Sequence, residues 1–153
     1  MYTATTQLTI NRFVPMNGVI GDSPSIDATI SPPVNTSPQP AGQKVPVFTG
    51  DGQSIRITVP SGYTGSTQLT YQLFDSRYVL LGLAFETPAK GAGRTEFSAL
   101  TINRDTTSSQ IIVTDECVPE LAGIDFNYVI LVQEVATGFI GLIDPDIETD
   151  IDQ

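Results

Sequence analysis

The sequence predicts an all-β protein built as a two-sheet antiparallel β-sandwich. Apolar and polar residues alternate with a period of two along many short segments, whereas helical periodicity is almost absent. Turn-forming stretches such as TGDGQS separate these segments at short intervals, with no amphipathic helix between them. Successive side chains of a strand point to opposite faces, so the segments are expected to be half-buried strands in two packed layers.

Ten segments are expected to form strands. The alternation is clearest in QSIRITV (53–59) and TQLTYQLF (67–74), where isoleucine, valine, leucine and tyrosine fall on one face. Asp51-Gly52 supplies the positive φ that a tight reversal needs. The full set covers residues 3–10, 26–30, 44–49, 53–59, 67–74, 77–85, 97–102, 108–115, 126–135 and 138–143.

The 153 residues are expected to form one domain, 1–153. Five prolines fall within residues 31–46, and because proline fixes φ and lacks an N–H, this stretch is predicted to be an extended loop inside the domain. The thirty residues before it are too few to fold alone. Residues 144–153 are predicted to be an acidic C-terminal tail.

The net charge of −10 arises entirely from the end of the chain, because residues 114–153 contain ten acids and no Lys or Arg. Nucleic-acid binding requires positive charge against phosphates, so it is not expected, and neither is binding to anionic membranes. No apolar run approaches the length of a membrane span, and the first residues do not resemble a signal peptide. With Cys117 as the single cysteine, a reduced, cytoplasmic setting is expected.

The sequence favours a non-enzymatic role and predicts neither catalytic nor cofactor-binding residues. Histidine is absent, which removes the usual general base and imidazole metal ligands. GDSPS (21–25) matches a hydrolase nucleophile motif that needs a histidine base, so the match is interpreted as chance. Acidic neighbours disfavour the thiolate of Cys117, which is therefore interpreted as a structural thiol.

Carboxylates occupy every second position from Asp144 to Asp152. A straight strand cannot bring all five to one calcium ion, and the glycine and final glutamate of an EF-hand loop are missing. Asp144, Asp146 and Glu148 are thus an incomplete ligand set that other loops would have to complete. The favoured interpretation is that like charges on a terminal segment discourage edge-to-edge pairing.

The C-terminal third favours the immunoglobulin-like type of sandwich, because Tyr128 near the start of a strand resembles the tyrosine of an E–F corner. In addition, LTYQLFDSRYVLLGLAF, LTINRDTTSSQIIVTD and TGFIGLIDPDI resemble the small bacterial DP-EP family over roughly residues 48–147. Its Asp-Pro-acid-Ile element would here be Asp144, Pro145, Asp146 and Ile147. The resemblance implies an immunoglobulin-like sandwich and no established activity.

Three functions are left open by the sequence. The first is a binding or assembly module whose partner is a protein, in particular a second copy, since pairing of sheet edges across a two-fold axis is a common route to dimers. The alternative is a cation- or carbohydrate-binding sandwich that uses the acidic end, with Tyr63 as a ligand contact. A component of a structural particle is a third option.

Overall fold

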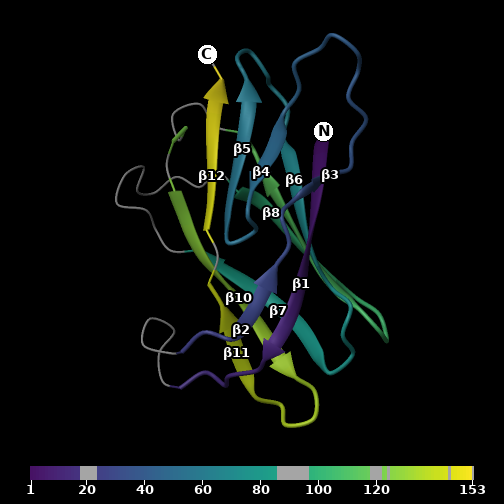
Figure 1. Cartoon of the computed structure of the whole chain (residues 1–153), viewed down its shortest axis with the longest axis vertical. Helices are drawn as coiled ribbons and strands as arrows, with labels where there is room; N and C mark the ends of the chain where they lie inside the picture. The colour runs from purple at the N-terminus through teal and green to yellow at the C-terminus, as the bar shows by residue number, and fades with distance from the viewer. Residues whose placement is uncertain (18–23, 86–96, 118–121, 124, 145, 153) are drawn as a thin grey trace.

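The computed structural model describes residues 1–17, 24–85, 97–117, 122–123, 125–144 and 146–152. Within these ranges the chain forms twelve strands arranged in two six-stranded sheets (Figure 1). All ten predicted segments correspond to strands, and the sequence analysis missed only the two-residue β3 and the last strand, β12. None of the described residues form a helix with the length and apolar character needed to cross a membrane.

The first sheet has the strand order β2-β1-β6-β9-β8, and β3 also pairs with β1. Its strands are β1 (Tyr2–Arg12), β2 (Asp27–Ile30), β3 (Val34–Asn35), β6 (Thr67–Leu73), β8 (Phe97–Arg104) and β9 (Ser109–Asp115). The second sheet has the order β11-β10-β12-β5-β4, and β7 also pairs with β10. Its strands are β4 (Val47–Gly50), β5 (Ser54–Pro60), β7 (Tyr78–Phe85), β10 (Asp125–Glu134), β11 (Ile140–Ile143) and β12 (Asp146–Asp152).

The two sheets share one hydrophobic core. Ile57 of β5 and Tyr71 of β6 are completely buried, as the two-residue alternation predicts for the inward face. The ring of Tyr71 meets the ring of Tyr128 in β10 edge-on, with centroids 6.1 Å apart, so side chains from both sheets interdigitate. The prediction of an all-β, two-sheet protein is therefore confirmed.

The expectation of purely antiparallel sheets is wrong at two places. β1 runs parallel to β6, with Tyr2 paired to Thr67 and Leu8 to Leu73. β12 runs parallel to β5 from the Asp146–Ser54 pair to the Asp152–Pro60 pair. In both cases the partners lie far apart in the sequence, so no tight turn constrains them to be antiparallel.

The proline-rich residues 31–46 connect β2 to β4 and contain β3. The side-chain amide of Asn35 fastens this stretch to the second sheet: Phe48 N–H donates to its Oδ1 at 3.1 Å, and its Nδ2 donates to the Phe48 carbonyl at 3.3 Å. Because β3 itself pairs with β1 of the first sheet, Asn35 links the two sheets at this edge.

The acidic end is a strand from Asp146 onward, which corrects the expectation of a tail. β12 lies between β10 and β5, pairing antiparallel with β10 at residues 146–148 and parallel with β5 throughout. The isoleucines between the acids fit this position in the sheet, because Ile147 is in register with Ile55 and Ile151 with Val59. Ile55 and Val59 are buried. Asp144 is exposed after β11, and Pro145 lies outside the described residues.

Candidate functional site

The acidic positions singled out as metal candidates are spread along a strand. Asp146 is in register with Ser54 and Glu148 with Arg56, while Asp144 precedes β12. Asp146 and Glu148 follow the extended geometry of β12, in which alternate Cα atoms stand roughly 6.5 to 7 Å apart. Elsewhere in the described part of the chain, acidic and cysteine side chains form no cluster of three or more that could hold a cation.

Tyr128 lies within β10 as part of the core. It is 1% exposed, and its ring packs on Tyr71 of the opposite sheet. Its role in the structure is thus to fill the space between the sheets.

Tyr63 is held in place at one end of the molecule. Its hydroxyl donates to the Ser66 carbonyl at 2.9 Å, and its ring meets Tyr2 edge-on at 6.0 Å. Gly65 lies beneath the ring, where a Cβ would come within 2.6 Å of the hydroxyl oxygen. Partial burial raises the pKa of Tyr63, and the neighbouring Cys117 raises it further. These contacts make Tyr63 a cover over the sandwich end, with its hydroxyl already engaged.

Asp115 and Cys117 form a buried polar group beside Tyr63, which no motif in the sequence indicates. Asp115 is 2% exposed, and its Oδ1 accepts the Cys117 N–H at 2.7 Å. Cys117 adopts φ +53°, an uncommon conformation for a residue with a side chain, and its thiol lies 3.8 Å from the hydroxyl of the buried Thr67. The Asp115 side chain thus stabilises the sharp turn that ends β9, and the Cys117 side chain is buried.

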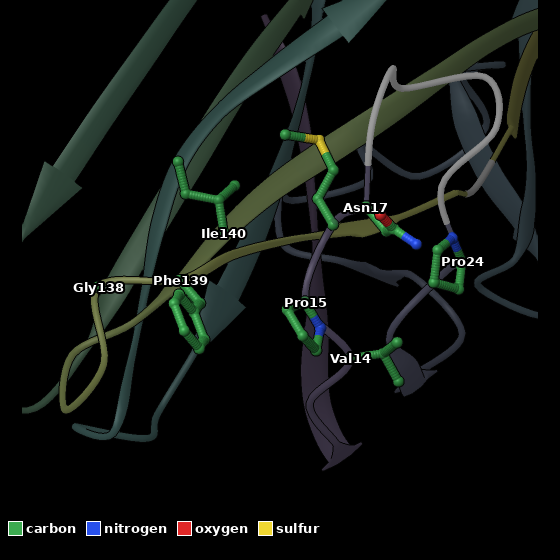
Figure 2. Close-up of a pocket in the computed structure, with 8 residues that line it drawn as sticks. Val14, Pro15, Asn17, Pro24, Gly138, Phe139 and Ile140 are labelled. Atoms are coloured by element: carbon green, nitrogen blue, oxygen red, sulfur yellow. The ribbon is translucent and has the colours of Figure 1, made fainter.

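An open groove of about 700 Å³ lies at the opposite end of the molecule, where the chain leaving β1 crosses β11 (Figure 2). Phe139 and Ile140 lie on one side, facing Pro15 across the groove. Met16 N–H donates to the Ile140 carbonyl at 2.6 Å, so the crossing segment is bonded to the edge of β11. The described lining contains no ionisable side chain, so it offers no group for acid–base chemistry.

The side of the molecule formed by β7 and β8 carries a second apolar surface. Leu100 and Ile102 of β8 are each 43% exposed, and Leu81 of β7 is exposed as well. Leu100 is in register with Val113 and Ile102 with Ile111, and both partners in β9 are buried. Residues opposite each other in antiparallel strands share a face, so Leu100 and Ile102 belong to the inward face of the first sheet. The second sheet does not cover them fully, because both side chains remain partly exposed.

β8 is also the last strand of its sheet, and no described strand pairs with its outer edge. The hairpin of β8 and β9 extends outward on the right of the molecule (Figure 1). Its tip is fixed by Asp105, whose Oδ1 accepts the N–H groups of Thr107 and Ser108, both at 2.8 Å. These hydrogen bonds lower the pKa of Asp105, and the bond from the Thr107 N–H has the largest effect. Within the described part of the chain, the outer edge of β8 is therefore left without a partner strand.

These features define an all-β protein with two packed sheets, in which one edge strand has no partner on its outer side among the residues that the structure describes. No known family profile matches the chain, and no curated protein matches its sequence. Among solved structures, the inclusion body protein PixA from Burkholderia cenocepacia is similar, with 11% identity over 96% of this chain and 94% of that chain and a TM-score of 0.47. This likeness is too low to assign that protein's fold or role to the chain.

Proposed function

We propose that this protein is a non-enzymatic assembly module that associates with a second copy of itself. The observation that carries the proposal is the long outer edge of β8, to which none of the described strands pairs, together with the half-exposed Leu100 and Ile102. Unpaired N–H and C=O groups of an edge strand are a ready template for another strand, and natural edges are usually protected by proline, lysine or short length. β8 is eight residues long and contains neither proline nor lysine.

The remaining expectations from the sequence belong to the same proposal. We propose that the sandwich is of the immunoglobulin-like type and that the chain is related to the DP-EP family, as the element from Asp144 to Ile147 suggests. The absence of histidine from the whole sequence supports a non-enzymatic role. The buried, single Cys117 is consistent with a reduced, cytoplasmic setting.

Multi-angle light scattering over a wide concentration series tests the proposal. We expect the mean molar mass to rise from that of the 16.4 kDa chain toward twice that value as concentration increases. A mass that stays at the monomer value throughout the series would show that the chain does not self-associate.

A further inference from the structure

The edges of the two sheets differ in how well they are protected. β2 and β4 have four residues each, and β3 has two. β7 has eight residues and pairs only with β10 among the described strands, but its Leu80 N–H donates to Ser109 Oγ of β9 at 3.1 Å, so its edge is partly engaged by the first sheet. β2 also contains an exposed aspartate, and β4 follows directly after Pro46. β8 has eight residues, of which Arg104 is the only charged one. Its pairing with β9 is irregular only between Phe97 and Ala99. From Ala99 to Arg104 the strand is regular, and no described strand pairs with its outer edge.

We propose that two copies pair β8 against β8, antiparallel, across a two-fold axis at Thr101. The inference rests on the proposed function and names the surface and the register that carry it. With the axis at Thr101, Leu100 of one copy lies opposite Ile102 of the other, and this pair occurs twice. Ala99 lies opposite Asn103 in the same register. The inward face of one sheet then continues into that of its partner, and the exposed parts of Leu100 and Ile102 cover each other.

Neighbouring registers are less favourable. An axis at Ile102 places Leu100 opposite Arg104, so a charged side chain faces an apolar one on the inward side. An axis at Leu100 pushes the pairing into the irregular region between Phe97 and Ala99. With the axis at Thr101, the regular residues 99–103 pair only with one another, and Arg104 and Ser98 meet at the two ends of the pairing, outside this regular stretch.

The distribution of charge favours the same surface. Each copy carries a net charge of −10, so two copies repel each other over most approaches. The strand 97–104 contains one arginine and no acid, and Glu96 and Asp105 border it. Contact at β8 therefore places no two carboxylates of the paired strands opposite each other.

The register can be tested by complementary charges, because position 100 of one copy faces position 102 of the other. Leu100→Glu alone places a charge against Ile102, and Ile102→Lys alone places one against Leu100. Each variant is expected to raise the dimer dissociation constant by about tenfold or more. An equimolar mixture is expected to form a heterodimer, since it contains one Glu–Lys pair and one Ile–Leu pair. Native mass spectrometry of the two variants, alone and mixed, measures this.

Val135→Lys is the matched control, because Val135 is an exposed apolar residue in the turn before β11, away from β8. It should leave the dimer as in the wild type. If the wild type dimerises and both β8 variants dimerise equally well, the β8 interface is wrong while self-association stands. If the variants are monomeric but their mixture forms no heterodimer, the register at Thr101 is wrong. A wild type that is monomeric at every concentration overturns both proposals.

Hydrogen exchange on the wild type gives a readout that does not depend on variants. Amides of residues 99–103 are expected to exchange more slowly at high protein concentration than at low concentration, because the second copy covers the edge. Protection that increases only in other strands would place the interface elsewhere.

Discussion

Gly52 occupies a position in the β4–β5 turn where a side chain does not fit. Its φ is +94°, and a Cβ would lie 2.2 Å from the Ile30 carbonyl oxygen and 2.6 Å from that of Ser31. Gly42 has a similar φ of +76° but open space around it. The two glycines thus separate the effect of backbone conformation from that of a steric clash.

We expect Gly52→Ala to destabilise the protein by more than about 3 kcal/mol, because both the conformation and the close backbone approach oppose a methyl group. Gly42→Ala should cost about 1 to 2 kcal/mol, from the conformation alone. Urea unfolding of both variants measures the difference. Equal losses of unfolding free energy in the two variants would mean that the backbone around Ile30 moves away from the added methyl group at no energetic cost.

Asn35 is the residue whose side chain joins β3 to β4, and neither of its bonds to Phe48 can be formed by alanine. We expect Asn35→Ala to lower the free energy of unfolding by about 1 to 2 kcal/mol, since the Phe48 N–H and carbonyl lose their partners. Asn35→Asp keeps an acceptor for the N–H and loses the donor, so it should retain part of the stability at neutral pH. Chemical denaturation of the three proteins tests the order.

Asp105 gives the β8–β9 turn a pH dependence whose sign follows from its lowered pKa. The folded protein holds this carboxyl below its ordinary value of 3.8, so its stabilising effect is complete above that value. The effect is lost as the pH falls through the lowered, folded value. We expect the stability advantage of the wild type over Asp105→Asn to shrink below about pH 4, in urea melts from about pH 7 to about pH 2. If the stability advantage of the wild type over Asp105→Asn increased as the pH falls, the ionised Asp105 carboxylate would not be its cause.

At the scale of elements, β12 shows how one pattern can be interpreted in two ways. The acids at every second position favour the prediction of a solvated tail. The isoleucine and threonine residues between them form the complementary pattern, which matches β5 residue by residue: Ile147 with Ile55 and Thr149 with Ile57. Alternation alone was a sufficient signal for a strand, and the charges obscured it.

Removal of β12 provides the corresponding test. A chain that ends at Asp144 lacks every backbone pair between β12 and β5 and those with the start of β10. We expect it to be unfolded or strongly destabilised, as judged by circular dichroism and thermal melting. The double variant Asp150→Asn and Asp152→Asn keeps the strand while it removes two charges, so it should fold as the wild type does. If the shortened chain were as stable as the wild type, the residues after Asp144 would not contribute to the fold and would be a tail after all.

The strands themselves could be predicted because hydrophobic alternation is a local signal. Their order could not, since β6, β8 and β9 alternate alike, and the pattern does not say which of them ends the sheet. The parallel pairs of β1 with β6 and of β12 with β5 join segments that are remote in sequence. No turn motif between the paired strands indicates such a pairing. The candidate edge was accordingly predicted as a strand at residues 97–102, but not as an edge. The Asp115–Cys117 turn depends on a left-handed residue that is not glycine, for which the sequence offers no rule.

At the scale of the whole molecule, the net charge opposes association of two copies. The Debye length is about 30 Å at 0.01 M ionic strength and about 8 Å at 0.15 M, so salt screens repulsion between acidic chains. We expect the dimer dissociation constant to fall as NaCl increases over this range. Sedimentation equilibrium at several salt concentrations measures it. Weaker association at higher salt would instead indicate that attractive ion pairs hold the copies together.

The position of β12 between β5 and β10 also has a consequence for the folding rate. Ile55 finds its neighbour Ile147 only after almost the whole intervening chain has been placed. Such pairings give a high contact order, and domains dominated by them fold slowly, on the millisecond-to-second scale. Until β12 docks, the backbone N–H and C=O groups on one side of β5 have no strand partner. A slow phase in stopped-flow refolding should therefore report the docking of β12, and the intermediate that precedes it is the species most prone to aggregate.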